Sequence, residues 1–355
     1  MKNTTVPTFL RRGTQSTWLF GTRRFLAIVA VFAFAIGCYD RAADSGAHSD
    51  QAPRRLKIGI QVSPAMTLLM VAKDRGYFQA EGLDVELTPF TAGKFALQAF
   101  LAKSVDLAVA GDVPAALAIL QGHDIRVVSQ VVDHTTNEVR VVALRDAEAS
   151  DARTYFKTKR RKLATSIGGG PEFFTHEFLR HYGIAPSEVD IISQKPEDMP
   201  AALAAKSVDA IAIFDPFAYL AEQRVGADAV TFSDRALYSE LYVLVASPNQ
   251  VLRERATLMR LIRALKRAET FIASDPTEAK AILMRYTKLD AQTVDAIWKN
   301  FAFGPALTGQ LAQYWRAEEV WAREANKVAA NAPTPDFGKH IDPSILRDAL
   351  PSSPK

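Results

Sequence analysis

The chain has 355 residues, of which 48% are hydrophobic and 23% are charged. This length allows two ordinary domains with separate cores, and this composition is typical of a soluble globular protein, which excludes disordered, collagen-like and multi-spanning chains. Five of the 43 Lys and Arg residues precede residue 25, and the rest of the chain has 38 Lys and Arg residues against 39 Asp and Glu residues. Because the basic excess lies only at the N-terminus, a nucleic-acid partner is not expected.

Residues 1–37 have the three parts of an export signal. A basic stretch ends at Arg24, twelve apolar residues follow from Phe25 to Ile36, and Gly37 precedes Cys38. Twelve helical residues rise about 18 Å, which is short of the ~30 Å hydrocarbon core. The segment resembles a bacterial lipobox, although Ala35 stands where Leu is usual. We therefore expect Cys38 to be lipidated, with a free thiol as the alternative, and the protein to be anchored on the periplasmic side of a bacterial membrane.

Residues 38–54 are rich in Ala, Ser, Asp and Gln and show no apolar periodicity, which predicts a tether. The stretch Thr22–Ala27 partly resembles a twin-arginine signal, so the export route stays open between the general and the twin-arginine pathways. Cys38 is the only cysteine. Neither an intramolecular disulfide nor a thiolate metal cluster is therefore available to the chain.

Strands and helices alternate from residue 56 onward. Leu56–Gln61 and Leu83–Phe90 read as strands, with a helix between them that starts near Pro64 and stops at Gly76. A helix over Phe95–Ala102 and a strand over Val105–Gly111 follow. This βαβαβ order predicts a mostly parallel sheet with helices on its faces.

The same pattern returns about a hundred residues later. The pentapeptide AKSVD occurs at Ala102–Asp106 and at Ala205–Asp209, each time between a helix and a strand. We therefore predict an α/β fold with two related lobes and a ligand cleft between them, because open parallel sheets bind ligands at the carboxyl ends of their strands. Residues 55–140 and 241–350 would form lobe one, residues 141–240 lobe two, and residues 137–144 and 238–247 the hinge. The remaining pattern predicts helices over 251–274, 276–286, 291–301 and 311–330, which would complete lobe one.

Three segments carry a family resemblance. They are VAKDRGYFQAEGLDVELTPF at Val71–Phe90, ALQAFLAKSVDLAVAGDVPAAL at Ala96–Leu117 and VDAIAIFDPF at Val208–Phe217. These segments resemble the nitrate/sulfonate/taurine type of periplasmic substrate-binding protein. The resemblance implies a monomeric receptor that delivers a small molecule to the permease and ATPase subunits of an ABC importer.

In that family the ligand is held by the turns that follow the strands. The resemblance therefore assigns ligand contacts to Ser63, Pro64, Thr91, Gly93, Lys94, Gly111, Asp112, Val113, Gly169, Gly170, Glu172, Phe173, Asp215 and Phe217.

Several of these residues have a second reading that needs no ligand. Asp112 would make a good N-cap for a helix over Ala115–Gln121. The glycines at 168–170 either cradle an anion with backbone amides or only form a tight turn. Lys94 either pairs with an acidic ligand or is solvated, and aromatic side chains such as Phe173 and Phe217 are often part of a core.

Catalytic motifs are absent from the sequence. The six histidines form no HExxH pair, and the chain has no G-x-S-x-G, GxxxxGK[ST] or GxGxxG motif. We therefore expect no enzyme, no cofactor and no metal. The resemblance favours an aliphatic sulfonate, taurine or nitrate as ligand, while a thiamine precursor, a flavin, an aromatic acid or a sensory role are alternatives. Asp112, Glu172 and Asp215 count against a simple anion unless they cap helices or pair with cations.

Overall fold

The computed structural model describes residues 53–136, 138–234, 236–329 and 331–351. Residues from Gln51 onward form one compact unit, to which the following description refers. The predicted export signal, the lipidation site Cys38 and nearly all of the predicted tether lie outside the described residues.

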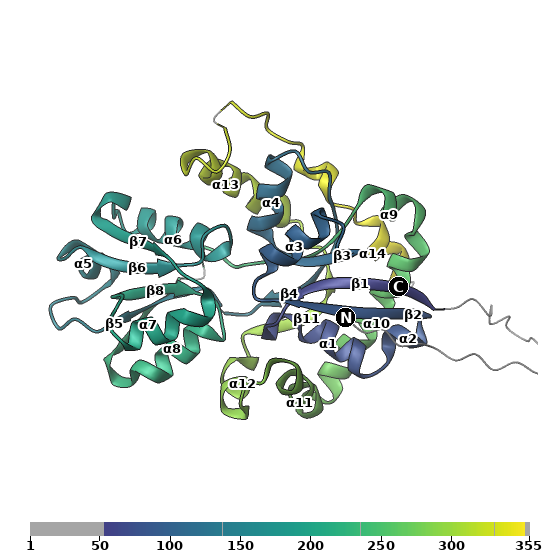
Figure 1. Cartoon of the computed structure of the whole chain (residues 1–355), viewed down its shortest axis with the longest axis horizontal. Coiled ribbons are helices and arrows are strands. Elements are labelled where there is room, and N and C mark those ends of the chain that lie inside the picture. Colours follow the sequence, from purple (N-terminus) through teal and green to yellow (C-terminus); the bar gives the residue numbers. More distant parts are fainter. Residues whose placement is uncertain (1–52, 137, 235, 330, 352–355) are drawn as a thin grey trace, which may run out of the picture. The chain divides into compact units, whose positions relative to one another are not determined.

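Two β-sheets organise the described residues (Figure 1). The first sheet has the strand order β11-β4-β10-β3-β1-β2. Strands β1, β2, β3 and β4 run in one direction, and β10 and β11 run in the other. The strands are β1 (Arg54–Gln61), β2 (Leu83–Phe90), β3 (Leu107–Gly111), β4 (Arg126–His134), β10 (Tyr242–Ala246) and β11 (Phe301–Ala306).

The second sheet has the order β7-β6-β8-β5-β9, in which only β5 runs against the others. Its strands are β5 (Arg140–Leu144), β6 (Arg161–Thr165), β7 (Val189–Ser193), β8 (Ala210–Ile213) and β9 (Ala229–Phe232). The order β7-β6-β8-β5 repeats the order β2-β1-β3-β10 of the first sheet, with the same directions. The repeated sequence pattern therefore corresponds to a repeated topology.

Helices connect these strands and cover both sheets. In the first repeat they are α1 (Thr67–Asp74), α2 (Tyr77–Ala80), α3 (Gly93–Leu101) and α4 (Asp112–Leu120). In the second repeat they are α5 (Ala152–Lys157), α6 (Gly170–His181), α7 (Met199–Ala204) and α8 (Phe217–Val225). The C-terminal part adds α9 (Pro248–Arg253), α10 (Arg255–Ser274), α11 (Pro276–Thr287), α12 (Ala291–Trp298), α13 (Leu311–Glu324) and α14 (Ser344–Ala349).

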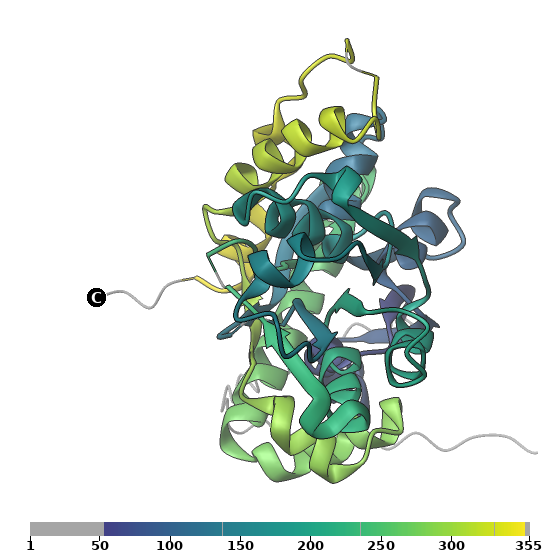
Figure 2. The same ribbon diagram turned by 90° about the vertical axis from the view of Figure 1, so that its left-hand side faces the viewer.

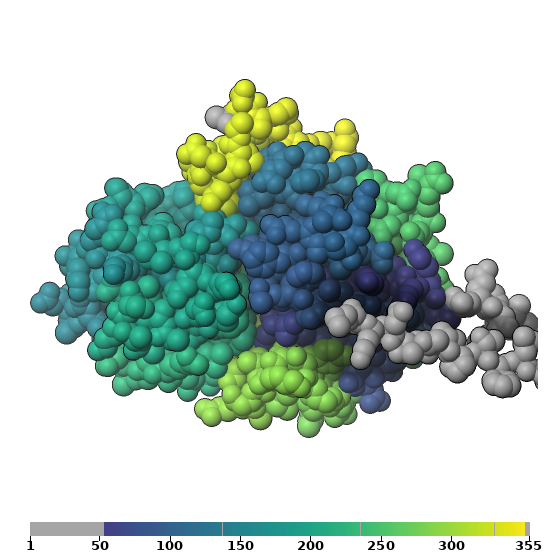
Figure 3. Space-filling model, in the orientation of Figure 1, coloured from purple at the N-terminus to yellow at the C-terminus, as the bar shows by residue number. Residues whose placement is uncertain are grey.

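The first sheet is buried on both faces. Leu107 and Val109 of β3 belong to a cluster with α1, α10 and α11, whereas Ala108 and Ala110 belong to a second cluster with α3, α4 and α13. This division follows from the alternation of side chains along a strand. Helix α13 packs against α4 and also reaches α6 of the second repeat. In the space-filling view the C-terminal part of the chain, in yellow, adjoins the blue surface of the first repeat (Figure 3). Helices α11 and α12 lie at the opposite end of this unit from α13 (Figure 2).

Some elements differ from the sequence-based expectations. Strands β4, β9 and β11 were not predicted, and Gly304 and Pro305 lie inside β11 where a break was expected. Proline lacks the N–H that a central strand needs, but β11 is an edge strand, and edge strands tolerate proline. Helix α13 ends at Glu324, earlier than predicted. Within the described residues, no helix is both long and apolar enough to span a membrane.

Candidate ligand-binding site

A small cavity lies where the carboxyl ends of strands from both sheets meet. Its volume is about 20 Å³, close to the space that one water molecule needs. Its lining comes from the ends of β1 and β3, from the start of α6 and from the segment before β10. The lining residues are Gln61, Ala92, Gly93, Lys94, Gly111, Pro114, Ser166, Gly169, Gly170, Pro171, Phe214 and Glu240.

Two larger pockets adjoin this cavity. One has about 380 Å³ and includes Thr91, Ser166 and Lys195, and the other has about 350 Å³ and includes Gln98 and Lys327. Lys94 lines the small cavity and both of these pockets. The Lys94 side chain therefore borders three neighbouring pockets, and the smallest of them is the one lined by residues of both sheets' strand ends.

Lys94 joins the two repeats directly. Its Nζ atom donates a hydrogen bond of 2.6 Å to the carbonyl oxygen of Ile167, which precedes α6. Burial lowers the pKa of the Lys94 ammonium group. The neighbouring Gly93 donates its N–H to Gln61 Oε1 at 3.0 Å, and a Cβ on Gly93 would lie 3.1 Å from the Cα atom of Ala110. Glycine therefore allows the close contact between the start of α3 and the end of β3.

Asp112 does not cap a helix, which makes the N-cap prediction wrong. Helix α4 begins at Asp112 itself, and its N-cap is Gly111. The Asp112 N–H donates to the carbonyl of Leu241 at 2.8 Å, so it is not free for a ligand. Its buried carboxylate accepts a hydrogen bond of 2.6 Å from the hydroxyl of Tyr238. Burial raises the pKa of Asp112 from 3.8 to about 6.

Asp112 belongs to a group of buried carboxyl groups that the sequence analysis did not identify. Glu240 is 4% exposed and accepts a hydrogen bond of 3.3 Å from the hydroxyl of Tyr242. Burial, with the negative charges of Glu138 and Asp112, raises the pKa of Glu240 well above its usual value. Burial and the negative charge of Asp112 likewise raise the pKa of Glu318 in α13 well above its usual value. The only sign of this group in the sequence is Glu240, a charged residue at the start of the otherwise mostly apolar segment ELYVLVAS.

Glu138 lies against a histidine near the crossing between the sheets. His134 Nε2 is 2.8 Å from Glu138 Oε2, and His134 Nδ1 is 2.7 Å from the carbonyl oxygen of Glu240. Burial acts to lower the pKa of His134, but the carboxylate of Glu138 outweighs it and raises that pKa. The pair therefore favours an imidazolium–carboxylate contact next to the segment that leads into β10.

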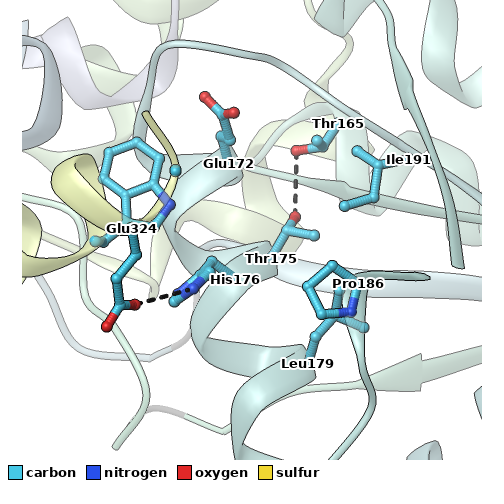
Figure 4. A pocket seen from close by; sticks show the side chains of 10 residues that line it. Thr165, Glu172, Thr175, His176, Leu179, Pro186, Ile191 and Glu324 are labelled. Atoms are coloured by element: carbon cyan, nitrogen blue, oxygen red, sulfur yellow. Dashed lines mark hydrogen bonds and ion pairs between the residues drawn. The ribbon is translucent and has the colours of Figure 1, made fainter. Parts of the chain in front are cut away.

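Glu172 lies in a separate pocket of about 280 Å³, shown in Figure 4. Its Oε1 atom is 2.6 Å from Lys327 Nζ, and its Oε2 atom accepts the N–H of Gly168 at 2.7 Å. Nearby, His176 Nε2 is 3.6 Å from Glu324 Oε2. Glu172 therefore fixes the glycine turn before α6 and pairs with a cation.

The remaining predicted contacts lie away from the small cavity. Asp215 is buried, 2.9 Å from Arg140 Nη2, and accepts a hydrogen bond of 2.8 Å from Asn300 Nδ2. Phe173 packs against Tyr238 and Trp321, and Phe217 packs against Phe214. Ser63, Pro64 and Val113 are buried in the described structure and line none of these pockets. Asp215 thus serves a structural ion pair in this conformation.

The described residues contain no group of three His, Cys, Asp or Glu side chains arranged to hold a metal ion. The carboxyl groups near Asp112 are therefore not assembled as a metal site. What the centre offers a ligand is the amino ends of α4 and α6, the ammonium group of Lys94 and the carboxyl group of Glu240.

Two sheets that share one strand order and meet at their carboxyl ends define the two-lobed fold of periplasmic binding proteins. The crystal structure of the periplasmic aliphatic sulphonate binding protein SsuA from Escherichia coli has a TM-score of 0.69 to this chain at 20% identity. It covers 78% of this chain and 94% of that protein. This likeness confirms the predicted fold class.

The chain belongs to the NMT1-like family, whose model matches residues 49–286. A putative binding protein of Brucella abortus is 23% identical over 257 residues, which is 69% of this chain and 74% of that protein. A putative aliphatic sulfonates-binding protein of Bacillus subtilis is 24% identical over 286 residues, which is 78% of this chain and 81% of that protein. These findings confirm the resemblance to substrate-binding proteins, and none of these relatives is named as an enzyme.

Proposed function

We propose that this protein is the extracytoplasmic solute-binding component of an ABC importer. The observation that carries the proposal is the meeting of the starts of α4 and α6 at one cavity, each helix preceded by a strand of a different sheet. Ligands of open α/β sheets bind at this place. The names of the relatives from Bacillus subtilis and Escherichia coli support the same function.

The ligand that we propose is a small organic anion of the aliphatic sulfonate, taurine or nitrate class. The positive end of the α6 dipole and the ammonium group of Lys94 favour a negative group at the cavity. Hydrogen bonds to a charged acceptor are stronger than neutral ones, so a few amides suffice. The buried carboxyl groups of Asp112 and Glu240 favour the second candidate, a thiamine precursor or another ligand with N–H donors.

The central cavity holds no more than about one water molecule, so an organic ligand requires the two sheets to move apart. We propose a hinge at residues 137–144 and 238–247, between lobe one (55–140 and 241–350) and lobe two (141–240). The ligand would then hold both lobes of the monomer together and shift the population toward one conformation that permease and ATPase subunits recognise. Solution scattering should give different radii of gyration with and without ligand, and equal radii at saturation would exclude the hinge.

Thermal unfolding of the full-length protein with ethanesulfonate, taurine and nitrate tests the ligand class. A ligand at a hundred times its dissociation constant stabilises the fold by about 2.7 kcal/mol. Gly169→Val should abolish this effect because Gly169 lines the cavity, and Lys94→Ala should weaken it. Gly309→Val is the matched control, since a Cβ at Gly309 meets nothing within 4 Å. A shift with aminopyrimidines and with none of the anions would favour the second candidate.

A further inference from the structure

The carboxyl group of Glu240 lies between the starts of two helices. A Cβ atom added to Gly111, the N-cap of α4, would be 2.5 Å from Glu240 Oε1. A Cβ atom added to Gly170, the first residue of α6, would be 2.7 Å from the same oxygen. One oxygen atom of one side chain therefore contacts both glycines, and only the absence of side chains at these positions leaves it room.

This oxygen lies at the amino ends of two helices. The positive end of each helix dipole favours a carboxyl or sulfonate oxygen there, although the N–H of Asp112 at the start of α4 already donates to Leu241. At α6 the N-cap is Gly169, which has no side chain to cap the helix, and Glu172 accepts the N–H of Gly168 in the turn before it.

A second, independent feature points to a ligand at the same place. Gln61 is 3% exposed and lines the small cavity together with Glu240. Its Oε1 atom accepts the N–H of Gly93, but its buried Nε2 group has no hydrogen-bond partner among the residues that the structure describes. A buried donor without a partner is costly, and a ligand oxygen would satisfy it.

We infer that Glu240 is an internal competitor of the ligand: its carboxyl group occupies the place that the acidic group of a bound ligand takes, and ligand binding displaces it. The inference rests on the proposed function as a receptor for a small organic anion and adds the residue that selects the ligand. Only a ligand whose acidic group interacts with the two helix starts better than Glu240 does can remain in the cleft. Glu240 thereby rejects ligands that lack such a group.

Removal of the Glu240 side chain tests this inference without knowledge of the natural ligand. In full-length Glu240→Ala protein, acetate and methanesulfonate should fill the vacated space and raise the melting temperature by several degrees, with saturation in the millimolar range. The wild-type protein should show no such shift at the same ionic strength. Glu318→Ala is the matched control, because Glu318 is equally buried but does not line the cavity. Acetamide and ethylammonium chloride control for size and for salt.

Two results would overturn the inference. One is a folded Glu240→Ala protein that acetate and methanesulfonate stabilise no more than they stabilise the wild type. The other is stabilisation of the wild type by ethylammonium without any anion effect on the variant, since the carboxyl groups would then bind a cationic ligand directly. If an anion binds the wild-type cleft but Glu240→Ala accepts no acetate, only this inference fails. If Glu240→Ala accepts acetate and no solute binds the wild type, only the proposed function fails.

A pair of glycine variants tests the same contact with Glu240 left in place. Gly170→Ala adds a methyl group 2.7 Å from Glu240 Oε1 and from the hydroxyl oxygen of Tyr238. Gly169→Ala adds one that meets only Pro171 Cδ, at an ordinary 3.7 Å. Gly170→Ala should lower the melting temperature by several degrees more than Gly169→Ala does. Equal melting temperatures would show that Glu240 does not lie at this place in solution, which would also overturn the inference.

Discussion

Lys103 and Lys206 have the same left-handed backbone conformation, with φ angles of 59° and 58°. Each lies in one copy of AKSVD, directly after a helix of its repeat. The aspartate three residues later acts in the same way in both copies. Asp106 accepts the N–H of Lys57 at 2.7 Å, and Asp209 accepts the N–H of Lys162 at 2.8 Å. The two copies of AKSVD therefore form the same turn, and the aspartate of each copy bonds the turn to the backbone of β1 or β6.

Replacement of either lysine by glycine should stabilise the protein. The left-handed conformation of a residue with a Cβ atom costs roughly 1 kcal/mol of folding free energy, and glycine avoids this cost. Part of the gain is offset because glycine makes the unfolded chain more flexible. We expect Lys103→Gly and Lys206→Gly each to raise the free energy of unfolding by up to about 1 kcal/mol, measured by urea denaturation. Alanine at the same positions should bring no gain. Unequal effects of the two glycine variants would contradict the equivalence of the two turns.

Asp112→Asn should change how stability depends on pH. The folded state raises the pKa of Asp112 from 3.8 to about 6, so the folded protein holds this proton more tightly than the unfolded chain does. The stabilisation is complete below pH 4 and is lost as the pH rises toward 6, by a total on the order of 3 kcal/mol. Asp112→Asn removes this loss. The variant should therefore be more stable than the wild type at pH 7.5 and similar to it near pH 4, by urea denaturation at both values.

Asp290→Asn is the control with the opposite sign. Backbone and side-chain hydrogen bonds from Thr293 lower the pKa of this exposed N-cap carboxylate. The stabilisation that the Asp290 carboxylate gives the folded protein is present above the pKa that Asp290 has in the unfolded chain, and it is lost as the pH falls. Asp290→Asn should therefore be less stable than the wild type at pH 7.5, and the difference should shrink in acid. A higher stability of Asp290→Asn at pH 7.5 would contradict the assignment of signs.

Arg140→Met should strongly destabilise the protein. Arg140 is mostly buried and lies 2.9 Å from Asp215 and 2.9 Å from Glu222. Removal of the guanidinium group leaves buried negative charge without its partner, which costs about 3–5 kcal/mol. Asp215→Asn in the same chain should recover part of the loss, because it removes the uncompensated charge. Urea denaturation of the two variants and the wild type measures both effects, and a loss below about 1 kcal/mol would show that the pair is dispensable.

Cys38→Ser tests the expected lipid anchor. Acyl chains hold a protein on a membrane through burial of their methylene groups, and several chains make release slow. The serine variant should therefore appear in the soluble fraction after cell fractionation, while the wild type stays with the membrane. Retention of Cys38→Ser on the membrane would contradict lipid anchoring at this residue.

Local patterns in the sequence were sufficient to predict most of the fold. Strand β2 has the predicted bounds because apolar residues alternate with polar ones after Gly82, which has a φ angle of 69°, up to the start of the next turn. The βαβαβ repeat predicted the chain order of β1, β2 and β3 in the first sheet and of β6, β7 and β8 in the second. Strands such as β11 were missed because their pairing partner in β4 is distant in the chain, and Gly304 and Pro305 favour a break locally.

The site was harder to predict for the same physical reason. The turn glycines and Lys94 could be proposed from the sequence, because a strand followed by a glycine turn and a helix is a local signal, and in the structure they line one cavity. Whether a carboxylate faces a ligand depends on distant partners. The Asp215 carboxylate forms an ion pair with Arg140 and accepts a hydrogen bond from Asn300, and the Asp112 carboxylate accepts one from Tyr238. Glu240 approaches Gly111 and Gly170 only after both sheets have formed, so no spacing in the sequence reveals it.

The hydrogen bond from Lys94 to Ile167 has a kinetic consequence. In this conformation the small cavity has about 20 Å³, so a solute larger than water can occupy it only if the two sides of the cavity, which this hydrogen bond joins, move apart. Solute capture would then begin with a spontaneous opening step, and at high solute concentration its observed rate would level off at the opening rate. At saturating solute concentration, a weaker Lys94 contact would therefore raise the rate of capture, whereas a further increase in solute would not.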